Sequence, residues 1–232
     1  MCGRYTQHHD TAQVAERFGA GETLFDSGPR YNVAPTQTVP VVVARESTSA
    51  PDAGVRVVDG FDWGLVPFWA KDASIGSKMI NARSETVAEK PAFKHAFTRR
   101  RCILPSDGFY EWDKAGGTKQ PYHFRRRDGE LFGFAGLWER WKKEDGSELY
   151  TCTILTTEAN QTVGPIHDRM PVILRTPEDE NLWLDAETHD SEMLLSLLRP
   201  YPEEWMEAVP VSKRVNRPVV DEPELLATVN SQ

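Results

Sequence analysis

The segment that decides the fold spans residues 102–155 and reads CILPSDGFYEWDKAGGTKQPYHFRRRDGELFGFAGLWERWKKEDGSELYTCTIL. Short runs of aromatic and β-branched residues alternate in it with clusters of turn-forming residues, a pattern typical of successive β-strands. We predict five strands, at 102–104, 109–112, 122–125, 131–138 and 150–155. Asp128-Gly129 predicts a hairpin turn between the third strand and the fourth, and Glu144 to Gly146 predicts a second hairpin tip.

The sequence before this segment predicts a short helix and further strands. Asp10 followed by Gln13 resembles a capping box, and it precedes a short amphipathic helix that is ended by the glycines at 19 and 21. Residues 84–97 are predicted to be helical, with a break near Pro91. Strands are predicted at 39–44, 55–58 and 61–63, the last two as a strand pair, and a polar loop is predicted at 47–54.

The sequence after it predicts two helices. Thr176-Pro177-Glu178-Asp179 places a capping threonine before a proline at the first helical position, and a second helix is predicted at 191–198. Many antiparallel strands with a few peripheral helices define an α+β fold built on a mainly antiparallel, barrel-like β-sheet. Because no repeat or long linker interrupts the chain, we expect a single domain over residues 1–232.

The composition excludes several classes of protein. The chain has 232 residues, 39% of them hydrophobic and 27% charged, which is normal for a globular domain with its own core. Cys2, Cys102 and Cys152 are too few for a disulfide framework and suit a reducing cytosol. The amino terminus lacks an apolar signal segment, and the longest apolar run, Val39 to Ala44, is too short to cross a bilayer. We expect a cytoplasmic protein with no membrane partner.

Motifs for common cofactors are missing. The sequence contains no phosphate-binding loop, no GxGxxG dinucleotide motif and no GxSxG nucleophile elbow, so we expect no cofactor. The cysteines and histidines do not have convincing zinc-site spacing. His8 and His9 are adjacent, and adjacent side chains on a regular strand or helix could not both face one ion. We therefore predict no metal site.

The charge distribution bears on nucleic-acid binding. A net charge of -8 argues against it when taken alone, because phosphate contacts dominate such affinity. A basic patch can still lie on an acidic protein, and two arginine triplets stand out, at 99–101 and 125–127. Taken singly, each triplet is most simply interpreted as solvated surface charge.

Cys2 can carry unusual chemistry if Met1 is removed, as happens when the second residue is small. Cys2 then offers an α-amine and a thiol on adjacent carbons. An α-amine has a reference pKa of about 7.7–8.0, so a useful fraction is neutral near neutral pH and can attack an aldehyde. The thiol can close onto the resulting imine carbon, giving a five-membered thiazolidine. An internal cysteine lacks the amine, so only an N-terminal cysteine can form this ring.

Three further segments place polar groups where they can act. Glu111 lies among the aromatic residues of FYEW at 109–112, and burial beside such rings favours an acid/base role. His167 lies in IHDRMP at 166–171, a predicted loop, and histidine transfers protons near neutral pH. Asn81 lies in INARSE at 80–85, where it could orient a reacting group. Taken alone, Glu111 is better explained as a strand glutamate that faces solvent, and His167 and Asn81 are equally explained by a structural role.

Together these segments closely resemble the SOS response-associated peptidase (SRAP) family of abasic-site processing proteins. The resemblance runs from residue 2 to about residue 217, and the tail after it is short. Seven motifs in one order are highly specific. They are MCGR at 1–4, YNVAP at 31–35, WGLVP at 63–67, INAR at 80–83, DGFYEW at 107–112, IHDRMP at 166–171, and PVS with VN at 210–216.

The resemblance implies a covalent capper of abasic sites in single-stranded DNA, with Cys2 forming the thiazolidine with the ring-opened sugar. It implies that Asn81 positions the reacting groups, that Glu111 is the acid/base in formation and reversal, and that His167 assists sugar ring opening. It also implies single-strand/double-strand junctions as partners, a role in the DNA damage response and association with the nucleoid. The implied DNA contacts are Arg4, Asn32, Trp69, Arg83 and Arg169.

One departure and two alternatives bear on this interpretation. Some family members carry two adjacent aromatic residues after the WGxxP segment, whereas Ala70 follows Trp69 here, which weakens DNA stacking unless Phe68 compensates. An N-terminal-nucleophile cysteine hydrolase, which the family name suggests, is the enzymatic alternative. A non-catalytic single-stranded DNA-binding protein is the alternative from another class. We expect a monomer.

Overall fold

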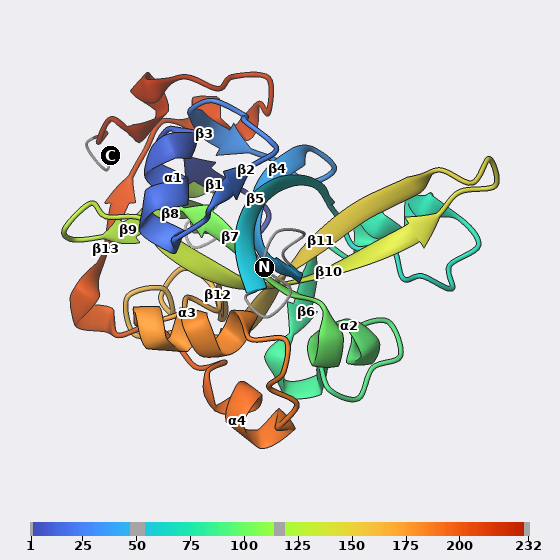
Figure 1. Ribbon diagram of the computed structural model, residues 1–232. Coiled ribbons are helices and arrows are strands. Elements are labelled where there is room, and N and C mark those ends of the chain that lie inside the picture. The colour runs from blue at the N-terminus through green and yellow to red at the C-terminus, as the bar shows by residue number, and fades with distance from the viewer. Residues whose placement is uncertain (1, 47–53, 114–118, 230–232) are drawn as a thin grey trace.

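The computed structural model describes residues 2–46, 54–113 and 119–229, and two β-sheets form its body (Figure 1). One sheet has the strand order β13-β9-β8-β1-β3, and the other has the order β12-β11-β10-β7-β4-β5-β2 with β6 beside β11. The strands are β1 (Tyr5–Gln7), β2 (Glu22–Thr23), β3 (Arg30–Val33), β4 (Thr38–Glu46), β5 (Gly54–Trp63), β6 (Asn81–Arg83), β7 (Arg101–Ser106), β8 (Gly108–Asp113), β9 (Gln120–Arg126), β10 (Phe132–Lys142), β11 (Glu148–Glu158), β12 (Arg169–Pro171) and β13 (Met206–Pro210).

The larger sheet closes into a barrel. Strands β11, β10, β7, β4 and β5 pair antiparallel in that order, and β5 returns to pair in parallel with β11 through Thr151↔Asp62 and Cys152↔Trp63. Closure removes the free edges that an open sheet would expose. The prediction of an α+β fold with a mainly antiparallel, barrel-like sheet is confirmed.

Short helices cover the outside of the barrel. They are α1 (Thr11–Phe18), α2 (Lys94–Arg99), α3 (Pro177–Leu184) and α4 (Ser191–Ser196). The predicted capping box of α1 is present, since Asp10 accepts from the backbone N–H of Gln13 while the Gln13 side chain accepts from that of Asp10. Thr176 caps α3 as predicted, and α4 ends at Ser196, two residues earlier than expected.

Strand β5 corrects one prediction. Residues 55–58 and 61–63 do not form two paired strands but belong to one continuous strand that pairs with β4 along its whole length. Asp59-Gly60 is therefore no turn. A Cβ on Gly60 would lie 2.5 Å from the ring of Phe25, so glycine at 60 makes room for that ring. The predicted polar loop falls largely in residues 47–53, outside the described part of the chain.

The Asp128-Gly129 turn is a second correction. Strand β9 pairs with β8 and β13, whereas β10 pairs with β7 and β11, so these two strands do not form a hairpin. The turn instead carries the chain from the smaller sheet into the barrel. The second predicted hairpin is confirmed, because Lys142 pairs with Glu148 across a tip that contains Gly146 in the left-handed region. Strands β10 and β11 extend from the body as a long arm (Figure 1).

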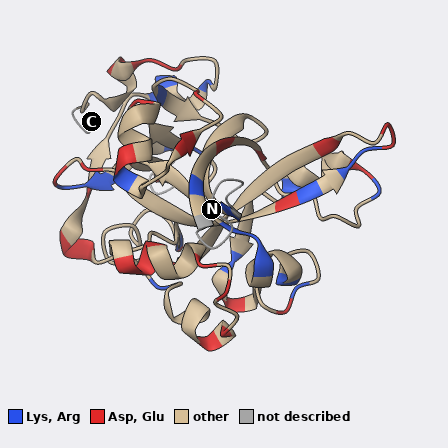
Figure 2. Cartoon of the chain, in the orientation of Figure 1, with Lys and Arg blue, Asp and Glu red and all other residues tan. Residues whose placement is uncertain are grey.

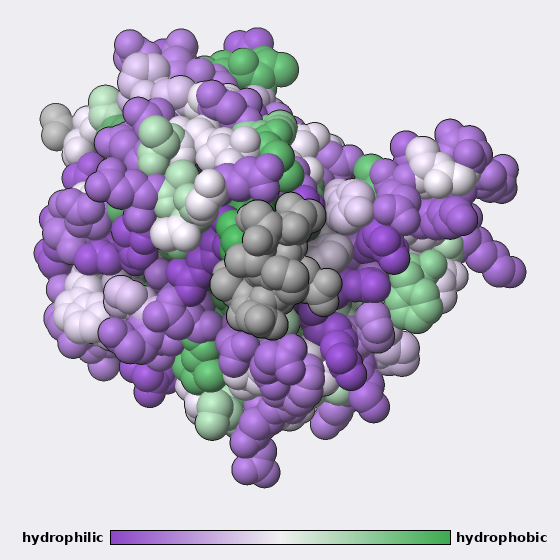
Figure 3. Space-filling view, in the orientation of Figure 1, coloured by the Kyte–Doolittle hydropathy of each residue, from purple (hydrophilic) through white to green (hydrophobic). Residues whose placement is uncertain are grey.

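Residues 84–97 are less helical than predicted. A 3-10 turn covers Ser84–Thr86, and the α-helix begins only at Lys94, after Pro91. Within the described ranges, no helix is long and apolar enough to cross a membrane. Hydrophilic residues dominate the visible face of the molecule (Figure 3), and Lys and Arg are interspersed there with Asp and Glu (Figure 2).

Candidate active site around Cys2

Cys2 is buried where the smaller sheet meets the barrel. Its side chain has 0% exposure and belongs to a core cluster that includes Tyr5 and Trp63. The side-chain amide of Asn81 donates a hydrogen bond of 2.8 Å to the backbone carbonyl of Cys2. The Cys2 thiol lies 3.9 Å from the carbonyl oxygen of Arg4, at the limit for a sulfur hydrogen bond. Cys2 is therefore held in place by packing and by one directed amide.

Asn81 is positioned by the barrel. It begins β6, which pairs in parallel with β11 through Ile154↔Asn81. Its Nδ2 atom holds Cys2, while its Oδ1 atom is buried and has no hydrogen-bond partner among the described residues. A buried acceptor without a partner is costly, and a bound reactant with an N–H or O–H group would satisfy it. This geometry agrees with a positioning role for Asn81, which stays a prediction.

Glu111 reaches the site from β8. Strands β1 and β8 pair antiparallel through Tyr5↔Phe109, and the N–H of Tyr110 donates to the carbonyl of Arg4 at 2.9 Å. Continuing this register places Glu111 opposite Gly3, beside Cys2. The Glu111 side chain is 4% exposed. Its burial beside the cysteine fits the predicted acid/base role.

The Cys2 thiol is held in its protonated form. Burial raises the pKa of this thiol well above its ordinary value, and the charge of Glu111 raises it further. Cysteine hydrolases need the opposite, a thiolate stabilised by a nearby cation or a helix N-terminus. The electrostatics around Cys2 therefore disfavour a thiolate nucleophile.

His167 lies between β11 and β12 and is mostly buried, with 15% of its side chain exposed. The backbone N–H of Arg169 lies 3.0 Å from His167 Nδ1, and the same nitrogen lies 3.1 Å from Oδ1 of Asp168 and 3.3 Å from the carbonyl oxygen of Arg169. The neighbouring Ile166 packs against the core cluster that contains Cys2. The loop that carries His167 is thus anchored to the same core as the cysteine.

Arg169 is committed to an internal contact, whereas Arg83 is free to reach solvent. The guanidinium of Arg169 forms a two-pronged ion pair with Glu85 and donates to the carbonyl of Thr156 at 2.5 Å. These contacts bind β11 and β12 to the segment after β6. Arg83 is exposed and stays a predicted phosphate contact. Arg169 therefore holds β11 and β12 against the segment that follows β6.

Arg4 and Asn32, two of the predicted DNA contacts, are both held by internal hydrogen bonds, and the half-buried Arg4 stays a predicted contact. Asn32 is fully buried, and its Nδ2 donates to the carbonyl of Val220 at 2.6 Å, so it cannot touch DNA in this conformation. Arg4 donates to Asn32 Oδ1 and to the carbonyl of Val215, both at 2.7 Å, and its guanidinium lies over the ring of Trp112. Both residues fasten the C-terminal segment across β1 and β3.

Trp69 lies on the surface as its predicted role requires. Phe68 and Trp69 have exposed fractions of 54% and 51%, although large aromatic side chains are usually buried. Phe68 borders a surface pocket of about 310 Å³. The other residues that line this pocket are His95, Arg100, Arg140, Lys142 and Glu148. Exposed rings beside basic side chains are the pattern that single-stranded nucleic acids require. The basic part of this surface was missed because its residues are far apart in sequence.

The arginine triplets are mostly satisfied within the protein. Arg101 is 5% exposed and donates to backbone carbonyls of α2 and of residues 183–188. Arg100 forms an ion pair with the buried Glu139. The remaining pairs are Arg125 with Glu207 and Arg126 with Asp128. Most members of the triplets are thus paired within the protein, so neither a basic patch nor freely solvated surface charge describes them.

The backbone conformation of His8 and His9 removes the physical reason for predicting no metal site. His8 and His9 lie in neither a strand nor a helix but in the bend between β1 and α1. Both rings turn toward Asp107, and potential ligand atoms of the three residues lie within 4.8 Å of one another. Asp107 belongs to the DGFYEW motif but is not among the site residues predicted from the sequence. No spacing rule could have found this cluster, because it joins residues 98 and 99 positions apart.

Comparison with known proteins identifies the class. The chain matches the family described as SOS response associated peptidase (SRAP) over residues 1–218, and it belongs to that family. It is 44% identical to the abasic site processing protein YoqW of Bacillus subtilis (strain 168), across 97% of this chain and 99% of that protein. It is 35% identical to the abasic site processing protein HMCES of Gallus gallus, across 87% of this chain and 66% of that protein.

Solved structures share the fold. A protein from Bacteroides thetaiotaomicron superposes with a TM-score of 0.86 at 29% identity, covering 99% of this chain and all of that one. A protein from Bordetella bronchiseptica superposes with a TM-score of 0.74 at 27% identity, covering 91% of this chain and all of that one. The closed barrel with its added sheet is therefore common to these proteins.

Proposed function

We propose that this protein captures abasic sites in single-stranded DNA by forming a thiazolidine through Cys2 after Met1 is removed. The substrate class comes from the relatives, which are named abasic site processing proteins. The observation that carries the proposal is the contact between Asn81 and the carbonyl of Cys2, beside the buried Glu111. It brings residues from two distant motifs, INAR and DGFYEW, to one amino-terminal cysteine.

The proposed reaction has two bond-forming steps. An abasic deoxyribose opens to an aldehyde, and the neutral α-amine of Cys2 adds to its carbon and expels water, giving an imine. The Cys2 sulfur then adds to the imine carbon while the thiol proton passes, through a nearby base, to the nitrogen. A thiol held protonated by burial suits this order, since the amine attacks first and the sulfur is deprotonated only at ring closure.

Each neighbouring residue has one role in the proposal. Glu111 transfers protons in imine formation, ring closure and the reverse reaction. Asn81 fixes the Cys2 carbonyl with its N–H and offers its buried Oδ1 to the reacting amine or hydroxyl. His167 assists opening of the sugar from the edge of the site. Proton transfer of this kind contributes typically about 10²–10⁴-fold to a rate.

The proposed DNA surface combines phosphate contacts with base stacking. Arg83 is exposed next to Asn81 in sequence, and Phe68 and Trp69 form an exposed aromatic pair beside basic side chains. Phe68 thus takes the place of the aromatic residue that is missing at Ala70. We extend the proposal to single-strand/double-strand junctions, to a role in the response to DNA damage and to action as a monomer. Because Cys2 is buried in the described chain, capture also requires a rearrangement at the amino terminus that lets DNA reach this residue.

A denaturing-gel time course tests the proposal. The purified protein is incubated with a single-stranded oligonucleotide that carries one natural abasic site. The matched control oligonucleotide carries a tetrahydrofuran abasic analogue, which cannot open to an aldehyde. We expect a covalent band with the natural site, none with the analogue and none with Cys2→Ala. Robust capture by Cys2→Ala, or by protein whose amino terminus is blocked by a tag, would refute the mechanism.

The same reagents separate the alternatives. A non-catalytic DNA-binding protein would bind both oligonucleotides reversibly and would protect abasic DNA equally well as Cys2→Ala. An N-terminal-nucleophile hydrolase would cleave peptides, would form no adduct with abasic DNA and would need a reactive thiolate. The raised pKa of the Cys2 thiol argues against the hydrolase.

A further inference from the structure

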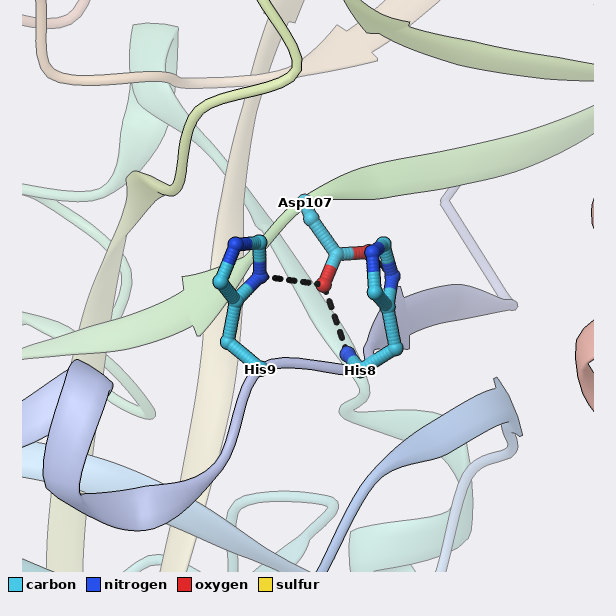
Figure 4. A group of neighbouring side chains, drawn as sticks. All are labelled: His8, His9 and Asp107. Carbon is cyan, nitrogen blue, oxygen red and sulfur yellow. Dashed lines mark hydrogen bonds and ion pairs between the residues drawn. The ribbon is translucent and has the colours of Figure 1, made fainter.

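The cluster formed by His8, His9 and Asp107 lies outside the chemistry proposed for Cys2. Figure 4 shows the carboxylate of Asp107 between the two imidazole rings. His8 Nδ1 lies 2.8 Å from Oδ1 of Asp107, and His9 Nδ1 lies 3.3 Å from Oδ2. Each histidine therefore faces a different oxygen of the Asp107 carboxylate. The three residues come from two loops, the β1–α1 connection and the β7–β8 turn.

The carboxylate is fixed before any ligand arrives. Its side chain is 1% exposed, the backbone N–H of His8 donates to Oδ2 at 2.6 Å, and the hydroxyl of Thr6 donates to Oδ1. Hydrogen bonds of this kind orient the ligands of metal sites from the second layer. The ring of His8 is fixed too, because it stacks on Tyr31 with 5.6 Å between centroids and 9° between planes.

Parts of both imidazole rings are open to solvent, since the side chains of His8 and His9 are 33% and 21% exposed. An ion and its water ligands can therefore reach the cluster. His8 Nδ1 is itself buried and faces Oδ1 of Asp107 at 2.8 Å, so a bound ion would replace this direct contact.

We propose that His8, His9 and Asp107 bind a divalent transition-metal ion, with Zn²⁺ as the best match. Two imidazoles and one carboxylate suit zinc, which takes four ligands at about 2.0–2.2 Å from N or O donors. Ligand atoms in such a site stand about 3.4 Å apart. The ligand atoms here already lie within 4.8 Å of one another, so a modest adjustment of the His9 ring would bring them close to that spacing. Water fills the fourth position.

The ion would stabilise the strand that follows the active cysteine. Strand β1 begins three residues after Cys2 and ends directly before His8, while Asp107 directly precedes β8, which carries Glu111. An ion shared by these loops links the end of β1 to the start of β8. It would stabilise the pairing that places Cys2 beside Glu111, without touching the reacting atoms.

Metal binding is measured directly, with protein that carries no polyhistidine tag. Co²⁺ is titrated as a spectroscopic probe, because its visible absorption reports a tetrahedral site, and Zn²⁺ is then added to displace it. All measurements use the Cys2→Ala background, which removes the thiol of Cys2 as a competing metal ligand near the amino terminus. We expect one equivalent of Co²⁺ to bind, and His8→Ala and His9→Ala each to weaken binding by about tenfold or more. His189 is exposed and lies outside the cluster, so His189→Ala serves as the matched control and should bind Co²⁺ as the background protein does.

A stability measurement complements the titration. Zn²⁺ should raise the unfolding temperature of the background protein and of His189→Ala, but not that of His9→Ala, since a ligand stabilises only the state that binds it. Absence of Co²⁺ binding to the background protein would overturn the proposal. Binding that is unchanged in both His8→Ala and His9→Ala would overturn it too, because the ion would then lie elsewhere.

Discussion

His123 offers a quantitative test of how the sheet beneath the active site is held together. Its ring is fully buried under β1 and β8, with Nε2 lying 3.1 Å from the hydroxyl of Thr6. A Cβ on Gly108 would lie 2.0 Å from that Nε2 atom, which explains the glycine of the DGFYEW motif. His123 Nδ1 has no hydrogen-bond partner within the described chain. A protonated ring would therefore be poorly solvated here.

The expected effect follows from the shift in pKa. Burial lowers the pKa of His123 to about 3. The negative charge of Asp107 opposes this shift and the positive charge of Arg125 adds to it, both by smaller amounts. In the unfolded chain a histidine has a pKa of about 6.5. Between these values the unfolded state binds a proton that the folded state does not, so acid favours unfolding. Integrating from about pH 7 to about pH 5 gives a loss of roughly 2 kcal/mol, a large share of a typical stability of about 5–15 kcal/mol.

The assay is urea unfolding of wild type and His123→Gln at a series of pH values down to about pH 5. The variant keeps a polar group near Thr6 but cannot titrate, so its stability should fall by roughly 2 kcal/mol less than that of wild type. His9, whose pKa is raised mainly by its hydrogen bond with Asp107, is common to both proteins and cancels in the comparison. The exposed His189→Gln should behave like wild type. Equal losses in wild type and His123→Gln would refute the reasoning.

Three further predictions concern the proposed function. Glu111→Gln should slow both capture and release of abasic DNA by about 10²–10⁴-fold while leaving DNA affinity unchanged, and unchanged rates in a single-turnover time course would contradict it. Trp69→Ala should weaken binding of single strands by about 1–3 kcal/mol in fluorescence anisotropy, and an unchanged affinity would show that the Trp69 ring does not stack on a base. Arg83→Ala should reduce the slope of log K against log salt by about 0.7, and an unaltered slope would remove Arg83 from the phosphate contacts.

The sequence predicted many of the strands because their patterns are local. The segments around Phe109, Phe134 and Ile154 combine aromatic and β-branched residues with strong turn signals, and each became a strand. Strand pairing was less accessible, since it depends on contacts distant in sequence. The Asp128-Gly129 turn has the residues of a hairpin, yet it connects two different sheets. The parallel pairing of β5 with β11, which closes the barrel, has no local signature.

The candidate site was predictable in its chemistry but not in its geometry. Cys2, Asn81 and Glu111 lie together as the motifs suggested. Asn32 illustrates the limit of motif reasoning, because the residue that the family pattern marks is buried in hydrogen bonds to backbone carbonyls. The cluster of His8, His9 and Asp107 was missed for a related reason. Adjacent histidines diverge on a regular element, but a bend turns both toward one carboxylate.

Intact mass spectrometry of the adduct tests the central claim most directly. The protein is incubated with a single-stranded oligonucleotide carrying one abasic site, and half of the product is then treated with borohydride. We predict that the protein has lost Met1 and that the adduct weighs the sum of protein and oligonucleotide less one water, unchanged by borohydride because a thiazolidine contains no C=N bond. An adduct on protein that retains Met1, or one that gains two hydrogens on reduction as an imine does, would contradict ring closure by Cys2.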